Sequence, residues 1–116
     1  GDSDRLGTFS YLATELGKRK LAFLCARESL EEPRLGPALK RAFGGVYVAN
    51  QGHTVETAQQ VLAAGEADAV AWGRLFIANP DLPHRLQIGA ALNTPNVATF
   101  YGGQAEGYTD YPALHA

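Results

Sequence analysis

Hydrophobic residues follow two periods in turn along this chain, one typical of helices and one typical of buried strands. Near the N-terminus, apolar side chains recur at helical spacing on Phe9, Leu12, Ala13 and Leu16. Gly17 and three basic residues end this predicted helix. The next segment, LAFLCA at residues 21–26, is a continuous apolar run and is predicted to be a strand buried on both faces.

The alternation of helix and strand continues through the middle of the chain. VYVA at residues 46–49 and AVAW at residues 69–72 are predicted strands, because β-branched and aromatic side chains favour extended backbone. Helical spacing recurs between the strands, first on Leu35, Ala38, Leu39 and Ala42 and then on Val55, Ala58, Val61 and Leu62. We expect Thr54 to cap the second of these helices and Gly65 to end it.

Strands that alternate with helices predict a parallel sheet, because parallel strands need a long crossover connection. Two α/β architectures contain such a sheet, the open doubly wound sheet and the (β/α)8 barrel. The open sheet usually carries the motif G-x-G-x-x-G after one strand, and the sequence lacks this motif there. The pattern therefore favours an α/β segment of a (β/α)8 barrel.

Composition excludes several classes of function. The 116 residues carry a formal net charge of -2, so the chain lacks the positive excess typical of nucleic-acid-binding proteins. Its apolar runs are far shorter than the roughly 20 residues needed to cross a bilayer, so we expect no membrane partner and a cytoplasmic location. The single cysteine, Cys25, lies in an apolar run and is predicted to be a buried small hydrophobe.

Polar, glycine-containing segments follow two successive predicted strands. Asn50, Gln51 and Gly52 follow the first strand, and Gly73 and Arg74 follow the second. In barrels, a phosphate commonly binds between such loops and the start of a short extra helix, where free amides favour an anion. Gly73 would let the backbone approach a phosphate, and Arg74 would supply a cation. Because Gly-Arg pairs also occur in loops without ligands, the pattern leaves both interpretations open.

The segment after Arg74 predicts a short helix at residues 75–79 and a longer one at 81–88. Asn79 is expected to act as a capping residue, and Pro80 suits the first position of the second helix. His53 and His84 match no catalytic pattern and are expected to be solvated surface residues.

Three longer segments carry a resemblance to a known family: GVYVANQGHTVETAQQVL, ADAVAWGRLFIANPDLPHRL and ATFYGGQAEGYTDYP. In order and spacing they resemble the C-terminal part of the Old Yellow Enzyme family of FMN-dependent ene-reductases, near its N-ethylmaleimide and nitrate-ester reductase branch. The resemblance implies that residues 1–116 are the C-terminal segment of an FMN-binding TIM barrel. Residues 1–20 would be a helix, 21–99 the βα units with strands six to eight, and 100–116 the tail.

The resemblance also implies roles for individual residues. The three residues from Asn50 to Gly52 would offer backbone groups to the FMN phosphate and ribityl chain, and Gly73 with Arg74 would bind the phosphate. The aromatic pair Phe100 and Tyr101 would lie against the dimethylbenzene edge of the flavin. Further along the tail, Tyr108, Asp110 and Tyr111 would fix the tail rather than touch a ligand.

The implied activity is that of an oxidoreductase, in which NAD(P)H reduces FMN and the flavin then reduces an activated alkene, a nitro compound or a nitrate ester. In the family, the catalytic side chains come from the N-terminal half, so we expect no catalytic residue and no metal ligand in this chain. Two alternatives stay open: a barrel segment that binds a different phosphate ligand, and a non-catalytic remnant that acts as an interaction module.

Three strands taken from a barrel would leave two free edges and an exposed apolar inner face. We expect that face to comprise Phe23, Tyr47, Val70 and Trp72. The chain is therefore expected to be completed by the N-terminal part of the barrel on another polypeptide, or by self-association. A small enone or nitro compound would be the substrate of the completed enzyme.

Overall fold

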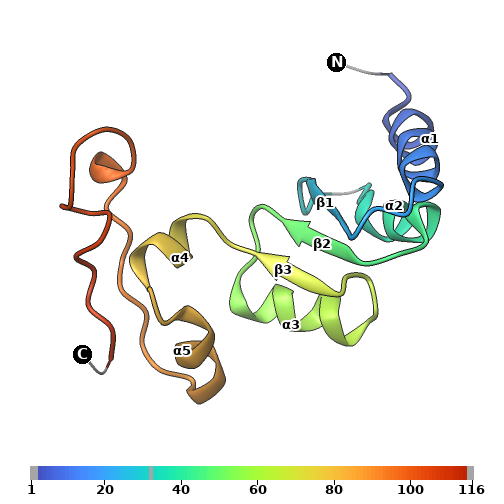
Figure 1. The fold of residues 1–116 in the computed structure, drawn as a ribbon. Coiled ribbons are helices and arrows are strands. Elements are labelled where there is room, and N and C mark those ends of the chain that lie inside the picture. The colour runs from blue at the N-terminus through green and yellow to red at the C-terminus, as the bar shows by residue number, and fades with distance from the viewer. Residues whose placement is uncertain (1–2, 32, 115–116) are drawn as a thin grey trace. The chain divides into compact units, whose positions relative to one another are not determined.

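A computed structural model describes residues 3–31 and 33–114 of the protein (Figure 1). The chain divides into two compact units, Gly1–Ala71 and Trp72–Ala116. The first unit contains a parallel sheet with its helices, and the second contains short helices and the C-terminal tail.

The first unit alternates helices and strands in the predicted order. It contains α1 (Arg5–Gly17), β1 (Leu24–Arg27), α2 (Gly36–Phe43), β2 (Tyr47–Asn50), α3 (Val55–Ala63) and β3 (Ala69–Ala71). The strands pair in the order β1-β2-β3, and both pairs are parallel (Figure 1). The predicted α/β class with a parallel sheet is confirmed. Among the described residues, no helix is long and apolar enough to span a bilayer.

Local side-chain chemistry places the helix ends. The Asp4 carboxylate accepts a hydrogen bond from the Gly7 amide at 3.0 Å and so caps α1. The Thr54 hydroxyl accepts from the Thr57 amide at 3.1 Å, and the Thr57 hydroxyl accepts from the Thr54 amide at 2.9 Å. These two bonds form a capping box, so the predicted cap of α3 is confirmed. Gly44 ends α2 in the left-handed conformation, with φ of 74°.

The first strand begins later than the apolar run predicts. Residues 21–23 are exposed, and β1 begins at Leu24, whose amide donates to the Val46 carbonyl at 2.9 Å. Lys20 has a left-handed conformation, with φ of 53°, which redirects the chain after α1. Half of the LAFLCA run therefore belongs to the connection, because hydrophobicity alone does not show where strand pairing starts.

One face of the sheet packs against the helices and forms the core. This face carries Leu24, Ala26, Tyr47, Ala49 and Val70. Tyr47 is 1% exposed, so the expectation that it and Val70 lie on an open inner face is wrong. Both side chains point toward the helices, because residues on one face of a strand alternate with those on the other. Burial raises the pKa of the Tyr47 hydroxyl to about 12.

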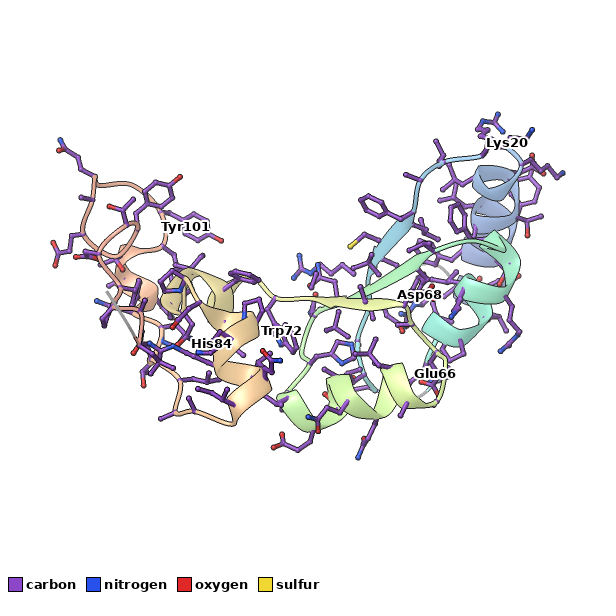
Figure 2. All side chains as sticks on the ribbon, turned by 60° about the horizontal axis from the view of Figure 1, so that its bottom comes forward. Lys20, Glu66, Asp68, Trp72, His84 and Tyr101 are labelled. Atoms are coloured by element: carbon purple, nitrogen blue, oxygen red, sulfur yellow. The ribbon has the colours of Figure 1, made fainter. Side chains whose placement is uncertain are left out.

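The opposite face of the sheet carries Cys25, Arg27, Val48, Asn50, Ala69 and Ala71. Cys25 is exposed, so the predicted buried thiol is wrong. Alternation along β1 turns its side chain away from the helices, even though its sequence neighbours are apolar. Phe23, which precedes the strand, is 55% exposed as expected. Trp72 lies in the second unit and is half-buried (Figure 2).

The second unit contains α4 (Arg74–Ala78), α5 (Leu82–Ile88), the 3-10 helix η1 (Val97–Thr99) and an irregular tail. The predicted short helix is confirmed as α4. The longer helix begins one residue later than predicted, because Asp81 takes the N-cap position. Pro83, rather than Pro80, lies in the first turn of α5, and Pro80 lies in the connection between the two helices.

Candidate functional site

The first predicted binding loop is a tight turn at the end of β2. Gln51 and Gly52 both have left-handed conformations, with φ of 79° and 77°. That conformation costs a residue other than glycine about 1–2 kcal/mol, so Gln51 needs compensating contacts. Its amide donates to Asn50 Oδ1 at 2.7 Å, and its Oε1 accepts from Arg27 Nε. These bonds hold an exposed polar turn at the carboxyl end of the sheet.

The second predicted loop follows β3, at the start of α4. Gly73 is the N-cap residue of α4, Arg74 is its first residue, and no side chain caps this helix. A Cβ added at Gly73 would meet no atom within 4 Å, so space is open beside this backbone. Arg74 is exposed, and no hydrogen bond or ion pair engages its guanidinium within the described ranges. The start of α4 therefore presents amide donors and one cation to solvent.

The predicted aromatic pair follows η1 in the tail. The ring centroids of Phe100 and Tyr101 are 6.5 Å apart with planes at 85°, which is an edge-to-face arrangement. Tyr101 is 92% exposed and projects from the tail (Figure 2), whereas Phe100 is half-buried. The pair offers an aromatic surface against which a flat ring can pack.

The seven predicted residues are divided between the two units. The turn after β2 belongs to the first unit, and the start of α4 and the aromatic pair belong to the second. Each unit thus contributes its own local set of binding groups, one a polar turn and the other a cation with an aromatic surface.

A buried polar network in the second unit was not evident from the sequence pattern. Asn79 is 0% exposed, and its Nδ2 donates to the Leu75 carbonyl at 2.9 Å. Its Oδ1 accepts from the Asn93 amide at 2.7 Å, and Asn93 Nδ2 donates to the carbonyls of Ala78 and Pro112, both at 2.8 Å. Asn79 therefore lies at the C-cap of α4 and joins it to the following chain, instead of capping α5.

Arg85 is the second member of this network. It is 4% exposed, and its Nε donates to Asp81 Oδ1 at 2.7 Å. Its Nη1 and Nη2 donate to the carbonyls of Ala91 and Pro112, both at 2.8 Å. Asp81 Oδ2 accepts from the Leu114 amide at 2.9 Å, and this bond, with the Arg85 guanidinium, holds the pKa of Asp81 below its usual range. A paired, buried guanidinium therefore fastens the tail to α5.

The tail also makes bonds within itself. The Tyr111 hydroxyl accepts from the Asn96 amide at 2.9 Å, and Asp110 Oδ1 accepts from the Gly107 amide at 2.7 Å. Both residues therefore fix the tail, as expected. Tyr108 differs from that expectation, because its side chain is 76% exposed and makes no hydrogen bond to another described residue.

The two histidines considered above differ in burial. His84 is exposed, as expected, but His53 is only 7% exposed, so a solvated position is wrong for His53. Its Nδ1 lies 3.4 Å from Thr57 Oγ1, and burial together with nearby Arg34 lowers the pKa of its imidazole. Among residues 3–31 and 33–114, no three His, Cys, Asp or Glu side chains lie together as metal ligands.

Relatives share sequence with nearly the whole chain, although no protein-family model matches it. The 12-oxophytodienoate reductase 1 of Oryza sativa subsp. japonica is 37% identical over 126 residues, which covers 97% of this chain and 32% of that protein. The 12-oxophytodienoate reductase 2 of Arabidopsis thaliana is 46% identical over 79 residues, which covers 67% of this chain and 21% of that protein.

Solved structures share the fold as well. Morphinone reductase in complex with tetrahydroNAD matches with a TM-score of 0.89 and 43% identity, over 98% of this chain and 32% of that one. The Old Yellow Enzyme homologue from Zymomonas mobilis matches with a TM-score of 0.91 and 40% identity, over 97% of this chain and 34% of that one.

Fold and sequence together define an α/β segment whose relatives are TIM-barrel reductases. The chain belongs to the Old Yellow Enzyme family, so the family predicted from the sequence is confirmed, whereas the C-terminal position and the reductase branch stay predictions. It spans 32% of the length of the rice reductase and 34% of the Zymomonas mobilis enzyme.

Proposed function

We propose that this chain is the C-terminal part of the barrel of an FMN-dependent oxidoreductase, in which it holds the FMN phosphate. The enzyme would use NAD(P)H to reduce an activated alkene, a nitro compound or a nitrate ester. The observation that carries the proposal is the Gly73–Arg74 pair at the uncapped start of α4, in a chain whose relatives are reductases.

The groups at the start of α4 fit a phosphate. The uncapped amides and the open space beside Gly73 admit an anion close to the backbone. Arg74 carries a permanent positive charge and can donate two parallel hydrogen bonds to phosphate oxygens. Because α4 has only 5 residues, its dipole is small, and Arg74 supplies most of the attraction.

The other predicted residues suit the remaining parts of the cofactor. The turn at Gln51 and Gly52 offers polar groups for the phosphate and ribityl chain. Phe100 and Tyr101 offer an aromatic surface for the apolar edge of the flavin ring. These assignments follow from the chemistry of each group and from the family relationship.

When bound, FMN supplies the hydride chemistry that amino-acid side chains lack. Arg74 binds and orients the cofactor through the phosphate, which is not the reacting group. The start of α4 and the turn after β2 therefore contribute affinity and position, while the rest of the barrel polarises the substrate and supplies the proton.

Replacement of Arg74 tests the proposal in an assembly of this chain with the part of morphinone reductase that lies outside the 32% it matches. Arg74→Ala is expected to weaken FMN binding about 10- to 100-fold, because a charge-assisted hydrogen bond contributes about 1.5–3 kcal/mol. The rate of hydride transfer at saturating FMN should stay unchanged. Fluorescence titration measures the first quantity and stopped-flow absorbance the second.

Arg41→Ala, which alters an exposed arginine of α2, is the matched control and should change neither quantity. An Arg74 variant with unaltered FMN affinity would contradict the assignment. A colourless assembly that binds sugar phosphates would favour a different phosphate ligand, and an assembly without NAD(P)H oxidation would favour an interaction module.

A further inference from the structure

The turn after β2 contains one buried side chain, which is that of His53. The other residues of 50–54 are half-buried or exposed, whereas His53 is 7% exposed. The bonds that hold Gln51 in its left-handed conformation link its amide to Asn50 Oδ1 and its Oε1 to Arg27 Nε, and both are exposed to water. Water competes for such groups, so exposed bonds contribute little net free energy. The imidazole of His53 is therefore the main anchor of the turn.

His53 also contacts the helix that follows the turn. Its Nδ1 lies 3.4 Å from Thr57 Oγ1, the hydroxyl oxygen that accepts the Thr54 amide in the capping box of α3. A neutral imidazole can accept the proton of this hydroxyl at Nδ1. An imidazolium carries N–H groups at both nitrogens, so the same oxygen would have to accept from the ring as well as from the Thr54 amide. The contact therefore favours the neutral ring and links the turn to the start of α3.

The charges around His53 also disfavour its protonation. Among the described residues, Arg34 and Glu28 act on the imidazole electrostatically. The Glu28 carboxylate accepts from two backbone amides at the start of α2, at 2.8 and 2.7 Å, and Arg34 Nη2 lies 2.8 Å from Glu66 Oε2. Burial, followed by the Arg34 cation, lowers the pKa of the imidazole, and Glu28 opposes this effect only in part. His53 is therefore neutral in the folded chain at pH 7.

We propose that His53, as a neutral and buried imidazole, positions the turn at Gln51 and Gly52 for the FMN phosphate, and that protonation of the ring releases the turn. A buried imidazolium near Arg34 would be a desolvated charge close to another cation, so the ring would leave its site for water. Gln51 would then lose the anchor that compensates its left-handed backbone. His53 is a positioning residue, because it acts through the turn and not on the reacting atoms. The inference rests on the proposed function, since it adds control by pH to the same turn.

The preference for a neutral ring sets the direction of the pH effect. The usual imidazole pKa is 6.5, and the folded chain lowers the pKa of His53 below this value. The closed turn thus binds fewer protons than the open turn, so closure is favoured above pH 6.5 and is lost as the pH falls through the lower pKa of the folded ring. The apparent dissociation constant of a ligand rises when its binding-competent form becomes less populated. Acid should therefore weaken FMN binding through His53.

The substitution His53→Phe tests the inference, because it keeps an aromatic ring in the buried site and removes the titrating group. FMN affinity is measured by fluorescence titration from about pH 5 to about pH 8, in the assembly used for Arg74→Ala. The FMN phosphate itself loses charge in acid, with a second pKa of about 6, and this affects both proteins equally. Over this range, FMN binding to the unaltered chain is expected to weaken at least ~3-fold more than binding to His53→Phe.

His84→Phe is the matched control, because His84 is an exposed histidine of the second unit. It makes the same replacement and should keep FMN affinity within about twofold of that of the unaltered chain at every pH. Parallel pH profiles for the unaltered chain and His53→Phe would overturn the inference. Tighter binding by the unaltered chain in acid, relative to His53→Phe, would also overturn it, because His53 would then attract the phosphate as a cation.

Hydrogen exchange in the FMN-free assembly separates this inference from the proposed function. The Thr54 amide donates to Thr57 Oγ1 at 2.9 Å and the Ala58 amide donates to the Thr54 carbonyl at 3.0 Å, so exchange of residues 53–58 reports on the anchored turn. Protection of this segment, corrected for the intrinsic exchange rate, should fall at least ~3-fold in acid in the unaltered chain but not in His53→Phe. Equal protection in both proteins would overturn the inference alone and leave the proposed function to the Arg74→Ala test. Loss of protection with parallel FMN profiles would overturn the inference and also contradict a role of the turn in phosphate binding.

Discussion

Different interactions stabilise the interiors of the two units. The core of the first unit is apolar, with Leu39, Phe43 and Val61 packed against the sheet, and its buried Tyr47 hydroxyl has no hydrogen-bond partner among the described residues. The second unit buries Asn79 and Arg85, and both make several hydrogen bonds. A sheet with its helices pairs its own backbone, whereas a tail without strands needs side chains to pair with its carbonyls.

This difference bears on the candidate site. Gly73, Arg74 and the aromatic pair lie in the unit whose tail is held by polar side chains. The position of that tail depends on a few hydrogen bonds of defined geometry, whereas the sheet of the first unit depends on many small apolar contacts. Substitutions that remove one type of interaction should therefore affect one unit and spare the other.

Removal of the buried Arg85 guanidinium should have the largest effect on the free energy of unfolding. Arg85→Ala is expected to lower the free energy of unfolding by about 3–5 kcal/mol, because it removes a buried side chain and leaves the carbonyls of Ala91 and Pro112 without donors. Urea denaturation gives the total loss, and hydrogen exchange by mass spectrometry locates it in residues 72–114. The control Arg41→Ala should change the free energy of unfolding by less than about 0.5 kcal/mol. An equal loss of protection in the sheet of the first unit would contradict the separation of the two units.

Truncation of a side chain in the apolar core should destabilise the first unit and leave the second unchanged. Leu39 is 5% exposed, so Leu39→Ala is expected to cost about 2–5 kcal/mol through lost burial and a cavity. Hydrogen exchange should rise in β1, β2 and α2 and stay unchanged around Arg85. Leu62→Ala, at a position that is 43% exposed, is the control and should cost less than about 1 kcal/mol. If both substitutions cost the same, the assigned core is wrong.

Removal of two tyrosine hydroxyls should change stability least. The two substitutions compare a hydroxyl that has no hydrogen-bond partner with one that has a partner. Tyr47→Phe removes a buried hydroxyl that lacks a partner, so stability should be unchanged or rise by up to about 1 kcal/mol. Tyr111→Phe removes the acceptor of the Asn96 amide and should cost about 0.5–1.5 kcal/mol. Thermal unfolding of both variants measures the difference. A loss at Tyr47 as large as that at Tyr111 would show that its hydroxyl has a partner after all.

Local pattern predicted most helices and strands but not every end. Strands β2 and β3 and helices α2, α3 and α4 lie within about two residues of their predicted positions, because spacing, capping residues and glycines act locally. The start of β1 and the start of α5 differ from their predicted positions. The first depends on the hydrogen bond from the Leu24 amide to the distant Val46 carbonyl, and the second on the bond from the Arg85 amide to the Asp81 carbonyl.

The candidate site was predictable to a similar degree. Gly73 and Arg74 stand out because a glycine and a cation at the end of a strand are a local signal. The hydrogen bonds of Asn79 and Arg85 have no such signal, because their partners are mostly backbone carbonyls, one of them 27 residues away from Arg85. Any residue type supplies a carbonyl, so sequence alone does not identify which one is used.

By itself, the sequence determined the order of helices and strands and the position of the Gly-Arg pair, since these are local patterns. It also determined the parallel sheet and the family, through the order of such patterns along the chain. Only the tertiary structure decided that Tyr47 and His53 are buried, that Cys25 is exposed, and that Arg85 fastens the tail. The physical reason is that burial and pairing depend on which face of an element meets its neighbours, and that face is set by packing between segments far apart in sequence.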